Sequence, residues 1–200
     1  MGRDHQMILP GNGQLKKVDI HIGEYFASRE PVVITTFLGS CVAVCLFDRK
    51  NKVGGMNHIL VPGKASFQEF NAPARFSINA MELLINAMMK LGGEKQKLNA
   101  KVFGGANVIP GLPHVNSVGS KISEFVLEFL AHEHIPVMGQ DLGGHKSRKV
   151  FFHTDTGNVY LRRSHSMKSS HLAVLEQKKL IRISKQLEKK TDVVIFDQPV

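Results

Sequence analysis

Two strands and the turn between them are predicted by residues 35–61, which read TTFLGSCVAVCLFDRKNKVGGMNHILV. Residues 42–47 are rich in β-branched and aromatic side chains, and residues 53–61 form a second strand-like run. The polar residues 48–52 between them have the composition of a turn. This stretch therefore predicts a β-hairpin.

The expected pairing of this hairpin brings a cysteine next to a histidine. If the chain reverses between Arg49 and Lys50, Cys41 lies directly opposite His58 on the neighbouring strand. Directly opposed residues have Cβ atoms roughly 5 Å apart. A thiol beside an imidazole is the arrangement of a cysteine nucleophile with its general base. We therefore expect Cys41 to attack a substrate, and His58 to take up the thiol proton and pass it to a departing amine.

A threonine is expected to hold the imidazole in place. A strand over residues 31–36 leads into a reversal in which Gly39 can adopt a positive φ. The hydroxyl of Thr35 can then accept a hydrogen bond from the ring nitrogen that does not face the sulfur. Thr36 competes for this role, although strand alternation points it to the opposite face from Thr35.

The backbone N–H groups of Ser40 and Cys41 are the nearest candidates for donors to an oxyanion on the substrate. A cysteine in an apolar strand is more often a small buried hydrophobic residue, and we interpret Cys45 in that way. Zinc and a disulfide are both disfavoured, because Cys41 and Cys45 would lie about 13 Å apart along one strand. No Walker-type or dinucleotide glycine motif appears, and the sequence predicts neither a metal site nor a cofactor.

Length and composition predict one domain with appendages. The chain has 200 residues, of which 42% are hydrophobic and 22% charged. We expect a flexible tail over residues 1–16, a domain over residues 17–163 and a basic, helical extension over residues 164–200. The first 16 residues hold no apolar run long enough for a signal peptide. Nothing approaches the roughly 20 apolar residues that span a bilayer, so we expect a cytoplasmic protein without membrane insertion.

The positive charge is confined to one part of the chain. Residues 145–190 contain 12 Lys and Arg against three acidic residues, which accounts for the whole formal charge of +9. Such a stretch is more often a solvated helical face than a binding surface. The functional alternative is a surface that attracts an acidic protein partner. Nucleic acid is not expected as a partner, because no recognisable nucleic-acid-binding module accompanies the charge.

The remaining elements follow from apolar periodicity and from turn residues. A helix is predicted over residues 77–91, with Ser77 as its N-cap and Gly92 and Gly93 as its end, and a second helix before Pro136. A further helical pattern covers the end of the chain. Other predicted strands cover residues 17–22, 101–103, 137–142, 148–154 and 158–162, and the last helix covers residues 169–190.

The motifs at residues 38–45, LGSCVAVC, and 54–62, GGMNHILVP, resemble those of the chemoreceptor glutamine deamidase family, CheD. The resemblance implies an α+β fold of two packed mixed β-sheets flanked by helices, similar to the catalytic domain of the cytotoxic necrotizing factor toxins. It extends over roughly residues 17–163 through shorter matches at residues 23–25, 80–85, 101–106, 141–144 and 148–150.

The resemblance also implies an enzyme, a protein-glutamine glutaminase. Members convert specific glutamines of chemotaxis receptors, the methyl-accepting chemotaxis proteins, to glutamate through a cysteine thioester and release ammonia. Some members also hydrolyse receptor methyl esters. By position the family's catalytic residues fall on Cys41, His58 and Thr35. The implied partners are receptor cytoplasmic domains and a CheC-type phosphatase, and no cofactor is implied.

One segment departs from the family pattern, because residues 119–122 read GSKI where members commonly have Gly-Glu-Arg-Asn. This departure bears on substrate choice more than on chemistry. It also leaves an alternative function, a non-enzymatic chemotaxis adaptor that binds a receptor or the CheC phosphatase.

Overall fold

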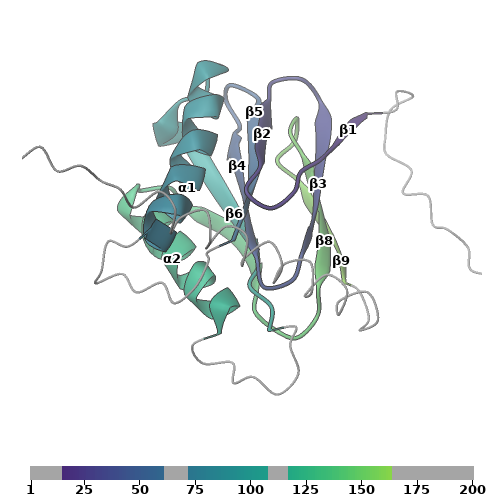
Figure 1. Ribbon diagram of the computed structural model, residues 1–200. Coiled ribbons are helices and arrows are strands. Elements are labelled where there is room, and N and C mark those ends of the chain that lie inside the picture. The colour runs from purple at the N-terminus through teal and green to yellow at the C-terminus, as the bar shows by residue number, and fades with distance from the viewer. Residues whose placement is uncertain (1–14, 61–71, 108–116, 164–200) are drawn as a thin grey trace, which may run out of the picture.

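The computed structural model describes residues 15–60, 72–107 and 117–163, and gives residues 72–77 by their backbone alone (Figure 1). Of the tail predicted over residues 1–16, residues 1–14 lie outside this described part, whereas Lys16 already belongs to the first strand. The extension predicted over residues 164–200 also lies outside the described part. In chain order the elements are β1 (Lys16–Asp19), β2 (Tyr25–Ser28), β3 (Val32–Leu38), β4 (Val42–Asp48), β5 (Val53–Ile59), α1 (Ala72–Lys90), a 3-10 turn (Lys95–Lys97), β6 (Leu98–Gly104), α2 (Val118–His132), β7 (Val137–Leu142), β8 (Arg148–His153) and β9 (Val159–Arg163).

The strands form two sheets that pack face to face (Figure 1). One has four strands in the order β1-β3-β8-β9, and the other has five in the order β2-β5-β4-β6-β7. In each sheet one pair of neighbours is parallel, β1 with β3 and β6 with β7, and the other pairs are antiparallel. Both sheets are therefore mixed, and the predicted α+β architecture is confirmed.

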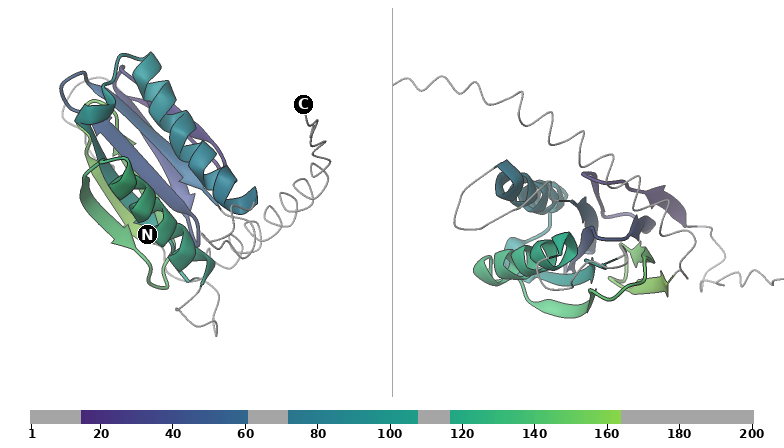
Figure 2. Two further views of the ribbon diagram at one scale, coloured as in Figure 1. Left: turned by 90° about the vertical axis from the view of Figure 1, so that its left-hand side faces the viewer. Right: turned by 60° about the horizontal axis from the view of Figure 1, so that its bottom comes forward.

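Both helices lie on the outer face of the five-stranded sheet (Figure 2). Residues of β5 show how the two faces of this sheet are divided. Gly55 lies against Leu84 of α1, whereas Gly54 lies against Thr154 at the end of β8 in the other sheet. Because successive side chains of a strand point to opposite faces, residues 54, 56 and 58 face the four-stranded sheet. This face of β5 carries His58.

Helix α1 packs through buried residues at three- and four-residue spacing, namely Met81, Leu84, Ile85 and Met88. It ends at Lys90, and Gly92 follows at a φ of +87°, as the sequence predicts. The predicted N-terminus is wrong, because the helix already begins at Ala72 and Ser77 lies inside it. The apolar pattern that sets the helical face does not mark the first turns.

Helix α2 has an N-cap at Ser117, whose hydroxyl accepts a hydrogen bond of 3.2 Å from the N–H of Ser120. Its apolar face buries Ile122, Phe125 and Val126. The helix ends at His132, before Pro136, as the sequence predicts.

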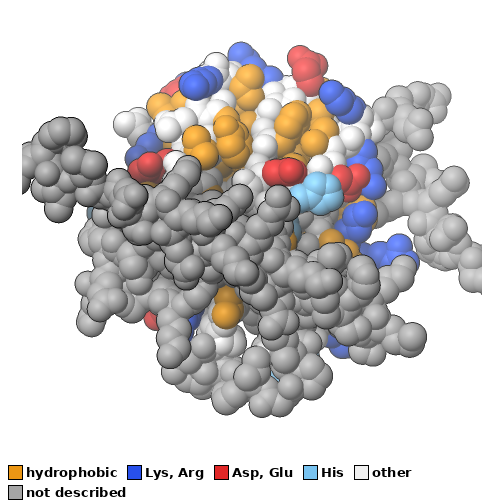
Figure 3. Space-filling model, in the orientation of Figure 1, with side chains coloured by type: hydrophobic (Ala, Val, Ile, Leu, Met, Phe, Trp, Pro, Cys, Tyr) orange, Lys and Arg blue, Asp and Glu red, His pale blue; other side chains and the backbone are white. Residues whose placement is uncertain are grey.

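The short strand β2 was not predicted from the sequence. Its four residues pair with residues 54–57 of β5, so β2 forms the edge of the five-stranded sheet. A strand of this length carries too little alternation to be recognised from its pattern. Among the described residues, no helix is both long enough and apolar enough to cross a bilayer. On the face shown in Figure 3, the described charged side chains of both signs are interspersed with hydrophobic ones.

Candidate active site

The hairpin of β4 and β5 has a different pairing from the predicted one. Asp48 pairs with Val53, and Ala43, not Cys41, lies opposite His58. The carboxylate of Asp48 accepts hydrogen bonds of 3.0 Å from the backbone N–H groups of both Lys50 and Asn51, and these bonds shape a longer turn. The expected direct opposition of Cys41 and His58 is therefore wrong by two residues.

A shift of two residues keeps side chains on the same face of a sheet. Cys41, immediately before β4, and Ala43 therefore point to the same side as His58, toward the four-stranded sheet. Cys41 and His58 are diagonal neighbours, and such pairs have Cα atoms about 7–8 Å apart, within reach of a long side chain such as an imidazole. The register thus places the predicted thiol and imidazole on one face of the hairpin, on neighbouring strands.

The imidazole of His58 is held by a threonine of the other sheet. The hydroxyl of Thr36 lies 2.8 Å from Nδ1 of His58 and 2.8 Å from the carbonyl oxygen of Ile20. A carbonyl only accepts, so the hydroxyl donates its single proton to Ile20 and must accept from Nδ1–H. The neutral ring then carries its proton on Nδ1, and Nε2 has the lone pair that can take a proton from a thiol.

The contact that was expected of Thr35 is therefore made by its neighbour. Thr35 pairs with Asp19 of β1 and donates a hydrogen bond to the Asp19 carboxylate. This hydrogen bond lowers the pKa of Asp19 below its usual value. Alternation along β3 was correctly predicted to point the two threonines to opposite faces, but it is Thr36 that faces His58.

The backbone around the cysteine is fixed by the residues that follow β6. The N–H of Gly105 donates to the carbonyl oxygen of Cys41 at 2.8 Å, and the N–H of Ala106 donates to that of Gly39 at 2.9 Å. Gly39 itself does not have the positive φ that was predicted, whereas Gly104 and Gly105 do, at +118° and +64°. The left-handed backbone conformation is thus adopted by Gly104 and Gly105, in the segment that is hydrogen-bonded to Gly39 and Cys41.

The site is closed in this structure, because Cys41 is 0% exposed and His58 is 3% exposed. A sulfur with no exposed surface cannot touch the side chain of another protein until the atoms that cover it move. A substrate of the predicted nucleophile must therefore open the site as it binds.

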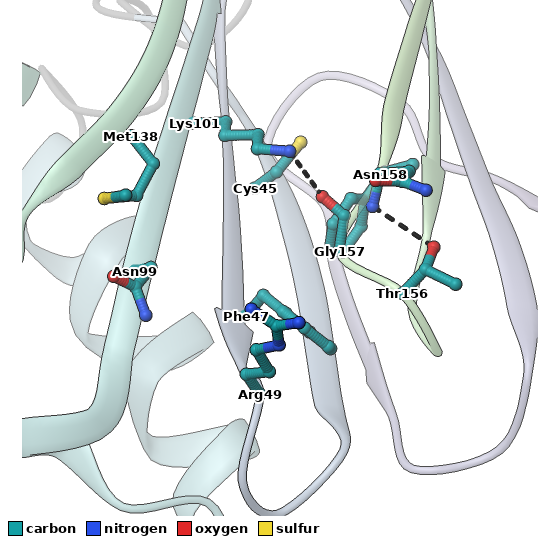
Figure 4. Close-up of a pocket in the computed structure, with 10 residues that line it drawn as sticks. Cys45, Phe47, Arg49, Asn99, Lys101, Met138, Thr156, Gly157 and Asn158 are labelled. Carbon is teal, nitrogen blue, oxygen red and sulfur yellow. Dashed lines mark hydrogen bonds between the residues drawn. The ribbon is translucent and has the colours of Figure 1, made fainter.

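The second cysteine lies in a different environment, four residues along the same face of β4. Cys45 lies at a cavity of about 370 Å³ between β4, β6 and the turn that joins β8 to β9 (Figure 4). Burial raises the pKa of its thiol above the usual range. Lys101 lies beside it but donates its hydrogen bond to the carbonyl oxygen of Gly157 at 2.8 Å (Figure 4). Because a thiol with a raised pKa is a poor nucleophile, Cys45 fits the structural role expected of it.

Comparison with known proteins places these motifs in a family. A family model described as CheD chemotactic sensory transduction matches residues 60–163. A Shewanella oneidensis protein named probable chemoreceptor glutamine deamidase CheD 1 is 45% identical over 183 residues, which cover 90% of this chain and 88% of that protein. A Stenotrophomonas maltophilia protein named probable chemoreceptor glutamine deamidase CheD is 45% identical over 81% of this chain and 80% of its own length.

A solved structure of a Neisseria meningitidis protein of family DUF152 is 12% identical. The structural match covers 66% of this chain and 63% of the Neisseria chain, with a TM-score of 0.34.

Proposed function

Since the chain belongs to the CheD family, whose members are named chemoreceptor glutamine deamidases, we propose that Cys41 and His58 deamidate glutamine side chains of chemotaxis receptors. The observation that carries this proposal is the fixed imidazole. Nδ1 of His58 lies 2.8 Å from the hydroxyl of Thr36, which donates its own proton to Ile20 and therefore accepts a hydrogen bond from Nδ1–H. His58 lies on the same face of the hairpin as Cys41. A thiol beside a base of defined tautomer is equipped for nucleophilic catalysis.

The reaction then runs as an acyl transfer through a thioester. Nε2 of His58 takes the thiol proton of Cys41, and the sulfur forms a bond to the carboxamide carbon of the receptor glutamine. The tetrahedral intermediate collapses as the C–N bond breaks, and His58 gives its proton to the departing ammonia. Water next attacks the thioester with His58 as its base, which releases glutamate and restores the thiol. The net change is the conversion of one carboxamide and one water into one carboxylate and one ammonium ion.

Backbone donors complete the proposed site. The N–H groups of Ser40 and Cys41 are the candidates for stabilising the oxyanion of the tetrahedral intermediate. Thr35, which the family resemblance assigns to the site, lies beside Thr36 and is hydrogen-bonded to Asp19. We assign Thr35 a supporting role, because that bond ties β3 to β1 at the position from which Thr36 reaches the ring.

The test is direct observation of the product. The protein is incubated with the cytoplasmic domain of a cognate receptor, and glutamate formation is followed by peptide mass spectrometry together with release of ammonia. Cys41→Ala is expected to abolish both signals, whereas Cys45→Ala, which removes the other buried thiol, is expected to retain them. A Cys41→Ala variant with parental activity would end the proposal.

The same variants separate the enzyme from the alternative adaptor. A non-enzymatic adaptor would bind the receptor, or a CheC-type phosphatase, equally well with and without the thiol of Cys41, and would release no ammonia. Activity on a receptor methyl ester would follow from the same thioester route, because an alkoxide replaces ammonia as the leaving group. Receptor cytoplasmic domains as substrates would place the reaction in the cytoplasm.

The segment that departs from the family pattern has a structural use at the start of α2. A Cβ on Gly119 would lie 2.5 Å from the carbonyl oxygen of Gly105, so only glycine fits this contact. Ile122 is buried at 1% exposure. Ser120 and Lys121 are the two residues of this segment that remain half-exposed, and they are the ones we propose to bear on receptor choice.

A further inference from the structure

Arg148 is a buried cation at the beginning of β8. It pairs with Leu38, the last residue of β3, and is only 2% exposed. A buried charge is costly unless it is paired and hydrogen-bonded. Its Nη1 lies 2.7 Å from a carboxylate oxygen of Asp141 and also donates to the backbone carbonyl of Asp141, while its Nη2 donates to the carbonyl of Gly143. The guanidinium thus binds the side chain and the backbone carbonyl of Asp141, near the end of β7, and the carbonyl of Gly143 in the turn between β7 and β8.

The segment that Arg148 holds is a turn with an unusual backbone. Gly143 and Gly144 both adopt left-handed conformations, with φ of +72° and +73°. The turn has two hydrogen bonds to the end of β6 and the residues that follow it. The N–H of Gly143 donates to the carbonyl oxygen of Gly104 at 2.9 Å, and the N–H of Asn107 donates to that of Gly144 at 2.8 Å.

The residues after β6 in turn hold the nucleophile. The N–H groups of Gly105 and Ala106 bind the carbonyl oxygens of Cys41 and Gly39, at 2.8 and 2.9 Å. The packing here is tight, because a Cβ added to Gly104 would lie 2.1 Å from the carbonyl oxygen of Cys41. With so little free space, a displacement of this segment must displace the backbone of Cys41.

We propose that Arg148 is a positioning residue for the proposed nucleophile, and that it acts through the turn at Gly143 and Gly144 and the segment 104–107 on the backbone of Cys41. The proposal rests on the function proposed above. Arg148 does not touch the substrate. It keeps the carbonyl of Cys41, and with it the neighbouring N–H groups that we propose as oxyanion donors, in the orientation that the reaction needs.

The shape of the side chain explains why arginine is required. A guanidinium presents several donors in one rigid plane, so it can bind the Asp141 carboxylate and the Gly143 carbonyl together. A lysine ammonium is a single point charge and cannot hold both sites in that fixed relation. Arg163 supplies a matched comparison, because it binds the same Asp141 carboxylate but has a side chain that is 60% exposed.

The experiment compares Arg148→Lys with Arg163→Lys in the full chain. Both variants keep the charge and lose one guanidinium on Asp141, but only the first removes the link to Gly143. We expect Arg148→Lys to lower kcat by roughly tenfold to a hundredfold with little change in KM, because small misplacements of reacting groups have effects of this size. Arg163→Lys is expected to stay within about twofold of the parent, as expected for an exposed ion pair.

Amide hydrogen exchange supplies a readout that does not depend on deamidation. The exchange of Gly105 and Ala106 is expected to accelerate in Arg148→Lys at a temperature where its thermal unfolding curve still shows a folded protein, and to stay parental in Arg163→Lys. Added guanidinium ion, well below denaturing concentrations, is expected to restore part of the kcat of Arg148→Ala, whereas sodium chloride at equal ionic strength is not.

The two readouts separate the two proposals. Parental activity of Cys41→Ala would end the proposed function. The exchange rates of Gly105 and Ala106 would still show whether Arg148 holds the segment 104–107. Parental exchange at Gly105 and Ala106 in Arg148→Lys, or an equal loss of kcat in both arginine variants, would overturn the positioning role.

Discussion

Replacing Thr36 by valine is expected to slow deamidation while the protein stays folded. The substitution keeps the β-branched shape and removes the hydroxyl that accepts from Nδ1 of His58 and donates to the carbonyl of Ile20, both at 2.8 Å. Without that hydroxyl the ring is no longer held with its proton on Nδ1. The tautomer with its proton on Nε2 becomes populated, and that tautomer cannot accept a proton from Cys41.

The size of the effect follows from the hydrogen bonds that are lost. An unsatisfied buried donor or acceptor costs about 1–3 kcal/mol. If the loss at Nδ1 is carried into the transition state, kcat/KM falls by about 5-fold to 150-fold. The free energy of unfolding should fall by a similar amount, because the carbonyl of Ile20 also loses its donor.

The assay combines kcat/KM on a receptor domain with the ¹⁵N chemical shifts of the His58 ring, which report its tautomer. Thr154→Val is the matched control, because Thr154 is also fully buried and binds the backbone of Glu30 and Val32, away from His58. It should lose stability and keep the His58 tautomer. Thr36→Ser should restore the parental shifts. If Thr35→Val changes the tautomer and Thr36→Val does not, the assignment of the ring contact is refuted.

Gly104→Ala is expected to lower the free energy of unfolding by about 3 kcal/mol or more, because the residue has a φ of +118° and the new Cβ would lie 2.1 Å from the Cys41 oxygen. Gly143→Ala, at a φ of +72° with nothing within 4 Å of the new Cβ, should cost only about 1–2 kcal/mol, and equal losses in urea unfolding would contradict the packing argument. Iodoacetamide is expected to modify Cys41 of the folded protein slowly, during transient openings of the closed site, because its sulfur is 0% exposed. Cys45 should be spared until unfolding, because burial raises the pKa of its thiol, and peptide mass mapping distinguishes the two. At Asp48, burial acts to raise the pKa but backbone and side-chain hydrogen bonds outweigh it, so the pKa is lowered and the carboxylate stabilises the fold above the usual value near pH 3.9. That stabilisation should be lost as the pH falls below this value, and Asp48→Asn should flatten the dependence of unfolding free energy on pH in the acid range.

The hairpin shows how far local patterns reach. β-branched and aromatic residues predicted both strands, but the pairing was wrong by two residues, because Asp48 accepts the N–H groups of Lys50 and Asn51 and so lengthens the turn. The error was harmless for the site. Side chains alternate with a period of two, so an even shift leaves Cys41 and His58 on the same face.

The arginine and the glycine doublets show what local patterns miss. The glycine doublets at residues 104–105 and 143–144 stand in the sequence without any local sign that the two segments are hydrogen-bonded to each other. Arg148 belonged to a basic stretch that was interpreted as solvated, and it is buried with Asp141. A charged residue at a strand start carries no local sign of burial, since burial depends on segments that are distant in the chain.

The sequence by itself determined the two strands around the turn, the helical faces, and the placement of a thiol and an imidazole on one side of a hairpin. These features depend on side-chain periodicity, which neighbouring residues set. Only the tertiary structure decided that Thr36 and not Thr35 meets His58. That choice depends on which face of β3 packs against the five-stranded sheet, and the contact joins strands that no local pattern relates to each other.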